Sequence, residues 1–198
     1  MSRMMFGRAV ALLILGGLSM LPGPTASGQE EKPDLDAMIA KPGKHHELLK
    51  KDVGTWDATV KMWMAGPDAP PEESKGVETT TLLGDGLWAV STFEGEFGGM
   101  KFRGQGQLGY DSKKGKYVGT WIDTMTDHIG FMEGTYDEAE KTLTMFMDST
   151  DPATGKPVKE KHVVKYVDPD TRSFTFSMPG PDGKDFKVME ITYKKRKS

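Results

Sequence analysis

Most of this chain alternates between apolar and polar side chains in about ten short segments, and a turn signal separates each segment from the next. The first segment places Trp56, Ala58, Val60, Met62 and Met64 on one face. Alternation with a period of two residues is typical of a half-buried β-strand. The glycines, prolines and aspartates between the segments supply the backbone freedom and side-chain caps that tight turns require. The sequence therefore predicts an all-β domain of consecutive antiparallel strands.

The number of strands favours a closed barrel. We expect strands over residues 54–64, 75–83, 87–97, 100–110, 116–123, 129–136, 142–149, 158–167, 172–178 and 186–194. An open sheet of this size would leave two unpaired edges and one exposed apolar face. We therefore predict an antiparallel up-and-down barrel of about ten strands, in preference to an open sandwich, with a short helix over 44–51 ahead of the first strand.

The first 28 residues have the pattern of a secretory signal peptide. Arg3 and Arg8 precede an apolar run over 9–21, and small residues follow it. That run is too short to span a bilayer, which takes about 20 residues. We expect a signal peptide over 1–28, a flexible leader over 29–43 and a single β-barrel domain over 44–198. We expect the protein to be secreted or periplasmic, and we expect that it is not an integral membrane protein after cleavage. The alternative is that the segment stays uncleaved as a membrane anchor.

Composition narrows the possible chemistry. The chain has no cysteine, so disulfides, thiol catalysis and cysteine-ligated zinc are excluded. Its formal net charge is −3 at pH 7, whereas a nucleic-acid-binding protein is usually basic. No nucleophile, phosphate or metal motif is present. The sequence predicts no nucleic-acid partner, no catalytic residue, no metal and no cofactor, and it leaves the oligomeric state open.

Five short blocks carry a resemblance to a known family. They are His46-Glu47-Leu48 ahead of Gly54-Thr55-Trp56, the block 83–88, Gly109-Tyr110-Asp111, the block 116–123 and the block 133–137. With these blocks the chain resembles the exported domain-of-unknown-function family 1579, which belongs with the calycin-like barrels. The resemblance covers about residues 44–193. It implies a calycin-like or lipocalin-like barrel and an export route, and it implies no activity.

The resemblance to lipocalin-like barrels also suggests a structural role for the start of the first strand. In such barrels the first-strand tryptophan packs at the closed end against a basic side chain from near the end of the barrel. Trp56 matches that tryptophan, and Arg196 or Lys195 matches the basic partner. Gly54 and Trp56 are therefore expected to be structural residues.

The densest polar and aromatic cluster runs from Trp121 to His128. Trp121 and Asp123 share one face of a predicted strand, and Asp127 and His128 lie in the turn that follows. Two carboxylates and an imidazole can hold a divalent cation or act as an acid and base pair. The alternative is that the aspartates cap the turn and His128 is solvated. His162 lies on an alternating strand and is a further candidate for an inward position.

Aromatic and methionine side chains on the predicted strands suggest a ligand pocket. Flexible thioethers suit an adaptable apolar pocket, and they also fill irregular cores. A barrel of about ten strands has room inside for a small molecule. We expect binding of a small apolar or amphiphilic molecule; the alternatives are a hydrolase-like or isomerase-like enzyme using Asp123 and its neighbours, and an interaction module with a filled core. The candidate ligand residues are Trp121, Asp123, Tyr110, Trp88, Phe102, Arg103, Met125 and His128.

Overall fold

The structure is a computed structural model that describes residues 35–66, 68–151, 154–180 and 183–197. The chain divides into two compact units, 1–38 and 39–198. In the first unit the described part is the helical turn α1 (Leu35–Met38), which falls within the predicted leader. The predicted signal peptide, 1–28, lies outside the described residues.

The second unit confirms the predicted all-β barrel. It begins with the 3₁₀ helix η1 (Lys44–Asp52), and a short 3₁₀ turn, η2 (Gly84–Gly86), joins the second strand to the third. The strands are β1 (Gly54–Met62), β2 (Glu72–Leu83), β3 (Trp88–Phe97), β4 (Met100–Asp111), β5 (Lys116–Asp123), β6 (Gly130–Asp137), β7 (Thr142–Thr150), β8 (Pro157–Asp168), β9 (Thr171–Pro179) and β10 (Asp185–Lys195). Every strand is antiparallel to the strands beside it.

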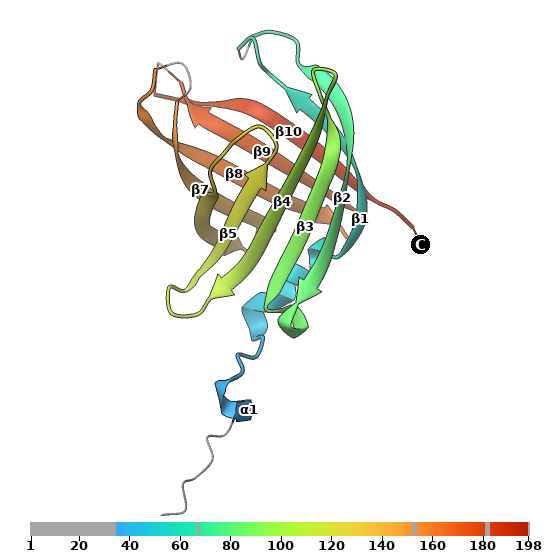
Figure 1. Ribbon diagram of the computed structural model, residues 1–198, viewed down its shortest axis with the longest axis vertical. Helices are drawn as coiled ribbons and strands as arrows, with labels where there is room; N and C mark the ends of the chain where they lie inside the picture. Colours follow the sequence, from blue (N-terminus) through green and yellow to red (C-terminus); the bar gives the residue numbers. More distant parts are fainter. Residues whose placement is uncertain (1–34, 67, 152–153, 181–182, 198) are drawn as a thin grey trace, which may run out of the picture. The chain divides into compact units, whose positions relative to one another are not determined.

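The first and last strands close the barrel. β1 pairs with β10 from Trp56 opposite Lys195 to Met62 opposite Met189. All other neighbours in the barrel are also neighbours in sequence, as in an up-and-down meander. Figure 1 shows the strands from green to red wrapping around a common axis, with η1 in light blue at one end.

The predicted strand ends agree closely with the observed ones, with one exception that matters for the interior. β5 spans the expected residues 116–123. The alternation of the first segment placed Met64 inside, and this was wrong, because β1 ends at Met62 and Met64 is 66% exposed. The backbone leaves the sheet here: the Trp63 N–H donates to the Val188 carbonyl at 2.9 Å, and a turn follows.

Helix η1 closes one end of the barrel. It starts at Gly43, whose N–H donates to His46 Nδ1 at 3.0 Å. Leu48 and Leu49 point into the barrel, and Leu49 is completely buried. The chain then turns into β1 at Gly54, which has a φ of 122° and lies where a Cβ would meet the Lys195 side chain at 3.0 Å. Only glycine adopts this backbone conformation without strain.

The buried core consists of two separate clusters. One packs Leu48 and Leu49 of η1 against Tyr117, Leu143 and other residues of the barrel wall. The second surrounds Trp56 and extends along β1 and β10. Met62, Phe102, Trp121 and Met189 are partly buried and pack against this second cluster, toward the end of the barrel opposite η1.

Candidate functional site

The closed end of the barrel contains a buried ionic network around Trp56. The Arg172 guanidinium lies 4.7 Å from the Trp56 ring centroid, and it donates to Asp52 Oδ1 at 2.8 Å and to Glu78 Oε1. The predicted basic partner of Trp56 is thus corrected in part. Lys195 Nζ does lie 5.2 Å from the Trp56 ring, whereas Arg196 pairs with Asp57 on the outside.

Burial determines the protonation behaviour of this network. Desolvation raises the pKa of Asp52 to about 6, although the charge of Arg172 and a hydrogen bond from Tyr166 act in the opposite direction. Burial also acts to lower the pKa of Arg172, but the carboxylates of Asp52 and Glu78 together outweigh it and raise that pKa. Arg172 therefore stays charged. With Trp56 only 1% exposed beside it, this end of the barrel is a structural plug.

The inner face toward the other end is open. One row of directly paired inward residues crosses five strands: Met62, Met189, Phe176, His162 and Met145. Met145 is 4% exposed and belongs to the core, while the other four are only half-buried. They share the inward face of Met145, so the space that exposes them lies inside the barrel.

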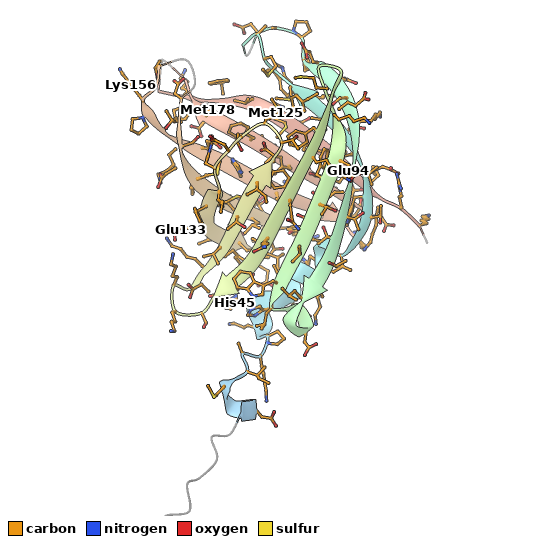
Figure 2. The ribbon with its side chains drawn as sticks, in the orientation of Figure 1. His45, Glu94, Met125, Glu133, Lys156 and Met178 are labelled. Carbon is orange, nitrogen blue, oxygen red and sulfur yellow. The ribbon has the colours of Figure 1, made fainter. Side chains whose placement is uncertain are left out.

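We call this region the open half. It is defined by the half-buried or polar inward residues Met62, Phe102, Trp121, Met147, Glu160, His162, Phe176, Met178 and Met189. Figure 2 shows Met178 at the end of the barrel opposite His45, which is part of η1. The open half is thus open to solvent at the end near Met178 and is closed at the end near η1.

Trp121 covers part of the inner wall of β4. A Cβ on Gly104 would lie 2.1 Å from the Trp121 ring, and one on Gly106 would lie 3.1 Å from it, so the two glycines leave the space that the indole occupies. The indole Nε1 donates to Asp123 Oδ2 at 2.9 Å. Asp123 Oδ1 accepts from the Met125 N–H at 2.8 Å and the Thr126 N–H at 3.0 Å. Asp123 both orients the indole and caps the turn after β5.

Glu160 and His162 form a second polar group on the inner wall. They are two residues apart on β8 and so share a face. His162 Nε2 lies 3.0 Å from Glu160 Oε2, and their side chains are 14% and 11% exposed. The His162 ring packs edge-on against Phe174 and Phe176, with centroids 5.5 and 5.1 Å away. This pair lies among apolar side chains and remains accessible to water.

A hollow of about 1110 Å³ opens where β2 begins, β3 ends and β4 begins. Its apolar lining includes Met62, Phe97 and Phe102, and charged side chains of both signs surround it. Phe102 also contacts Phe93 and Phe97, at centroid distances of 6.0 and 5.6 Å. Phe102 is therefore part of an aromatic wall at the mouth of the barrel.

The structure brings together three of the predicted ligand residues: Trp121, Asp123 and Phe102 lie on the inner face. Tyr110 is at the closed end, where its ring stacks on His45 with centroids 4.2 Å apart.

The remaining four predicted ligand residues are not on the inner wall: Trp88 and Arg103 face outward, and Met125 and His128 lie in the exposed turn after β5. Trp88 is 39% exposed on the outer face above Gly109. The Arg103 side chain pairs with Glu94 outside the barrel. Met125 is 60% exposed, and the His128 side chain is 66% exposed beside Asp127.

Glu160 was missed by the sequence analysis, although a signal for it existed. Once His162 is placed inward, the period of two places Glu160 inward as well. Among the described residues, no group of three or more His, Asp or Glu side chains has the arrangement of a metal site. No helix in the described ranges is long and apolar enough to cross a membrane.

Comparisons with known proteins give a family and a fold. The family model described as "Protein of unknown function (DUF1579)" matches residues 41–195. No curated protein matches the chain. Among solved structures, Rv2717c from M. tuberculosis is similar with a TM-score of 0.56 and 12% identity, over 79% of this chain and 100% of that one. The S-type phycobiliprotein lyase CPES from Guillardia theta is similar with a TM-score of 0.50 and 14% identity, over 84% and 99%. These likenesses concern the barrel fold alone.

Proposed function

This chain belongs to the DUF1579 family, and we propose that it is an exported barrel that binds a small apolar or amphiphilic molecule in its open half. The observation that carries the proposal is the row from Met62 to His162. Its side chains face inward and are still half-buried, whereas Trp56 and Leu143 near η1 are 1% exposed. Apolar side chains that share an interior with water provide a site where an apolar ligand gains from leaving water.

The composition of the open half suits a ligand with a flexible apolar part. Met147, Met178 and Met189 present thioethers whose side chains adapt their shape to a ligand at low cost. Phe102, Phe176 and Trp121 add rigid flat surfaces. The polar groups are few and local: Asp123, the Glu160 and His162 pair, and Glu72 at the rim opposite Met62. Such a wall, mostly apolar with a few fixed polar groups, is typical of small-molecule sites.

Export is part of the proposal and has its own support. The positive start, the short apolar run and the small residues before Gln29 form a secretory signal. A fusion of residues 1–28 to a reporter enzyme that is active only outside the cytoplasm tests this. Activity of the fusion, together with a mature N-terminus near Gln29 in the full-length protein, is the expected result. Cytoplasmic full-length protein that keeps Met1 would overturn it.

The binding proposal is tested by titrating delipidated protein with the neutral fluorophore N-phenyl-1-naphthylamine, whose emission rises in apolar surroundings. We expect saturable binding of one or a few molecules, and native mass spectrometry of protein from its own host should show a small molecule that organic extraction removes. To locate the site, Met178→Asp places a charge in the open half, and Thr175→Asp serves as the control on the outer face of the same strand. Saturable binding that Met178→Asp leaves unchanged, or no binding at all, would overturn the proposal.

A further inference from the structure

The open half differs from the closed end in the charges on its inner face. Within the described residues, the inward-facing cations on the strands are Arg172 and Lys195, and both lie against Trp56 at the closed end. The open half carries the carboxylates of Asp123 and Glu160 and the imidazole of His162. At its rim lies a further, exposed carboxylate, that of Glu72, which is paired with Met62. Its lysines and arginines, such as Lys161 and Arg103, point outward into ion pairs.

Asp123 and Glu160 differ in what remains available to a ligand deeper in the barrel. Both carboxylate oxygens of Asp123 already accept hydrogen bonds within the protein, one from the Trp121 indole and the other from backbone N–H groups of the following turn. Glu160 has one interaction among the described residues, from Oε2 to His162 Nε2. Its second oxygen, Oε1, keeps its lone pairs for a ligand. The residue as a whole is only 8% exposed, so this charge is largely removed from bulk water.

The imidazole adds a second acceptor. When His162 Nε2–H donates to Glu160, the neutral ring is left with Nδ1 as an acceptor. In that tautomer the pair presents two acceptors, Glu160 Oε1 and His162 Nδ1, to a ligand. Phe176 lies beside the ring, and Trp121 and Phe102 provide further aromatic faces on the inner wall. Aromatic faces attract cations, and a half-buried carboxylate attracts them more strongly.

We infer that the ligand of this barrel is a cationic amphiphile, with an ammonium or similar hydrogen-bond donor at Glu160 and His162 and an apolar chain along the methionines of the open half. The inference rests on the proposed binding function and specifies the chemical class of its ligand. An anionic amphiphile, such as a fatty acid, meets an uncompensated carboxylate at the same place. A single charge-assisted hydrogen bond of ordinary strength corresponds to about a tenfold difference in affinity.

Three molecules with the same chain and different heads separate this inference from the proposed function. Decylamine, decanol and decanoate are titrated at pH 7 against the full mature chain, by displacement of N-phenyl-1-naphthylamine and below their aggregation concentrations. The expected result is that decylamine binds about tenfold more tightly than decanoate, with decanol between them. Equal affinities, or a preference for decanoate, would overturn the inference and leave the binding proposal standing. If none of the three binds and the fluorophore does not either, both fail.

A variant that removes the charge of Glu160 tests whether this residue causes the preference for decylamine over decanoate. Glu160→Gln keeps the shape of the side chain, and we expect it to reduce the ratio of decylamine to decanoate affinity to near one while decanol affinity changes little. Asp148→Asn is the matched control, since Asp148 lies on the neighbouring strand and pairs with Lys159 on the outer face at 2.7 Å. It should keep the full preference. If Glu160→Gln retains the preference, or Asp148→Asn loses it, the assignment to Glu160 is wrong; thermal unfolding of both variants shows that each is folded.

Discussion

The indole ring of Trp121 fills the space that a Cβ atom on Gly104 would need, since that atom would lie 2.1 Å from Trp121 Cζ2. The two residues belong to neighbouring strands, and Trp121 pairs directly with Gly106. The absence of side chains on β4 is therefore what gives the indole its place on the inner wall.

Gly104→Ala is expected to displace the Trp121 ring and weaken ligand binding. Overpacking of this kind typically costs about 1–3 kcal/mol of unfolding free energy. Gly109→Ala is the matched control, because its Cβ would meet the Trp88 ring at 2.4 Å on the outside of the barrel. Trp88 is 39% exposed and can swing into solvent. Denaturant unfolding and probe titration should show reduced affinity for Gly104→Ala alone; equal losses in both variants would mean that the effect comes from general destabilisation.

Tryptophan fluorescence should report the ligand through Trp121. We expect that binding of an apolar ligand changes the emission of the wild-type protein, that Trp121→Phe removes most of this change, and that Trp88→Phe keeps it. The reason is that Trp121 lines the open half, while Trp88 is on the outer face. A signal that disappears with Trp88→Phe and persists with Trp121→Phe would place the ligand outside the barrel.

Replacement of Arg172 should strongly destabilise the protein. Arg172→Met leaves the carboxylates of Asp52 and Glu78 buried without their cation, and breaking a buried ion pair in this way typically costs about 3–5 kcal/mol. The exposed pair of Arg196 and Asp57 provides the comparison. Arg196→Met should shift the urea midpoint no more than an ordinary surface substitution does. Similar midpoints for the two variants would show that the network contributes little.

The raised pKa of Asp52 predicts a specific pH dependence. The folded state holds the Asp52 proton up to about pH 6, whereas the ordinary pKa of an aspartate is 3.8. The contribution of this group to stability is therefore complete below about pH 4 and is lost as the pH rises through 6. Asp52→Asn removes this pH-dependent contribution, because asparagine does not titrate. The unfolding free energy of the wild type relative to Asp52→Asn should therefore fall by up to about 3 kcal/mol between pH 4 and pH 7. A difference that is constant with pH, or that rises, would contradict the assignment.

The sequence was sufficient for the strands because their alternation is strong. The segment 116–123 gave β5 with both ends correct, since Gly115 and the charged turn before it mark the start clearly. The sequence did not predict which side chains face the interior where apolar and polar residues do not alternate clearly. Trp88 was expected to line the pocket, yet the inward residues that follow it on β3 begin with Ala89, Ser91 and Phe93, two of them small. Size and polarity there give no clear alternation.

Contacts across the barrel were harder to predict than strands. Arg172 reaches Trp56 because β9 pairs with β10 and β10 with β1, with Tyr193 opposite Arg172. The register of those pairs is not encoded in the alternation of either strand, and the resemblance to lipocalin-like barrels indicated Lys195 or Arg196 near the chain end instead. The shared face of Glu160 and His162 could be predicted without the register between strands, because it follows from their spacing of two residues on one strand.

The pairing of β1 with β10 has a consequence for the way the domain forms. The strand that completes the barrel is the last to leave the ribosome, so every shorter nascent chain has two open edges and an incomplete core. Contacts between the first and last strands also make folding slow compared with a domain of local contacts. For the export proposed above, this delay would keep the chain extended long enough to pass through a narrow translocation channel. A truncation anywhere before β10 should yield aggregates rather than a smaller barrel.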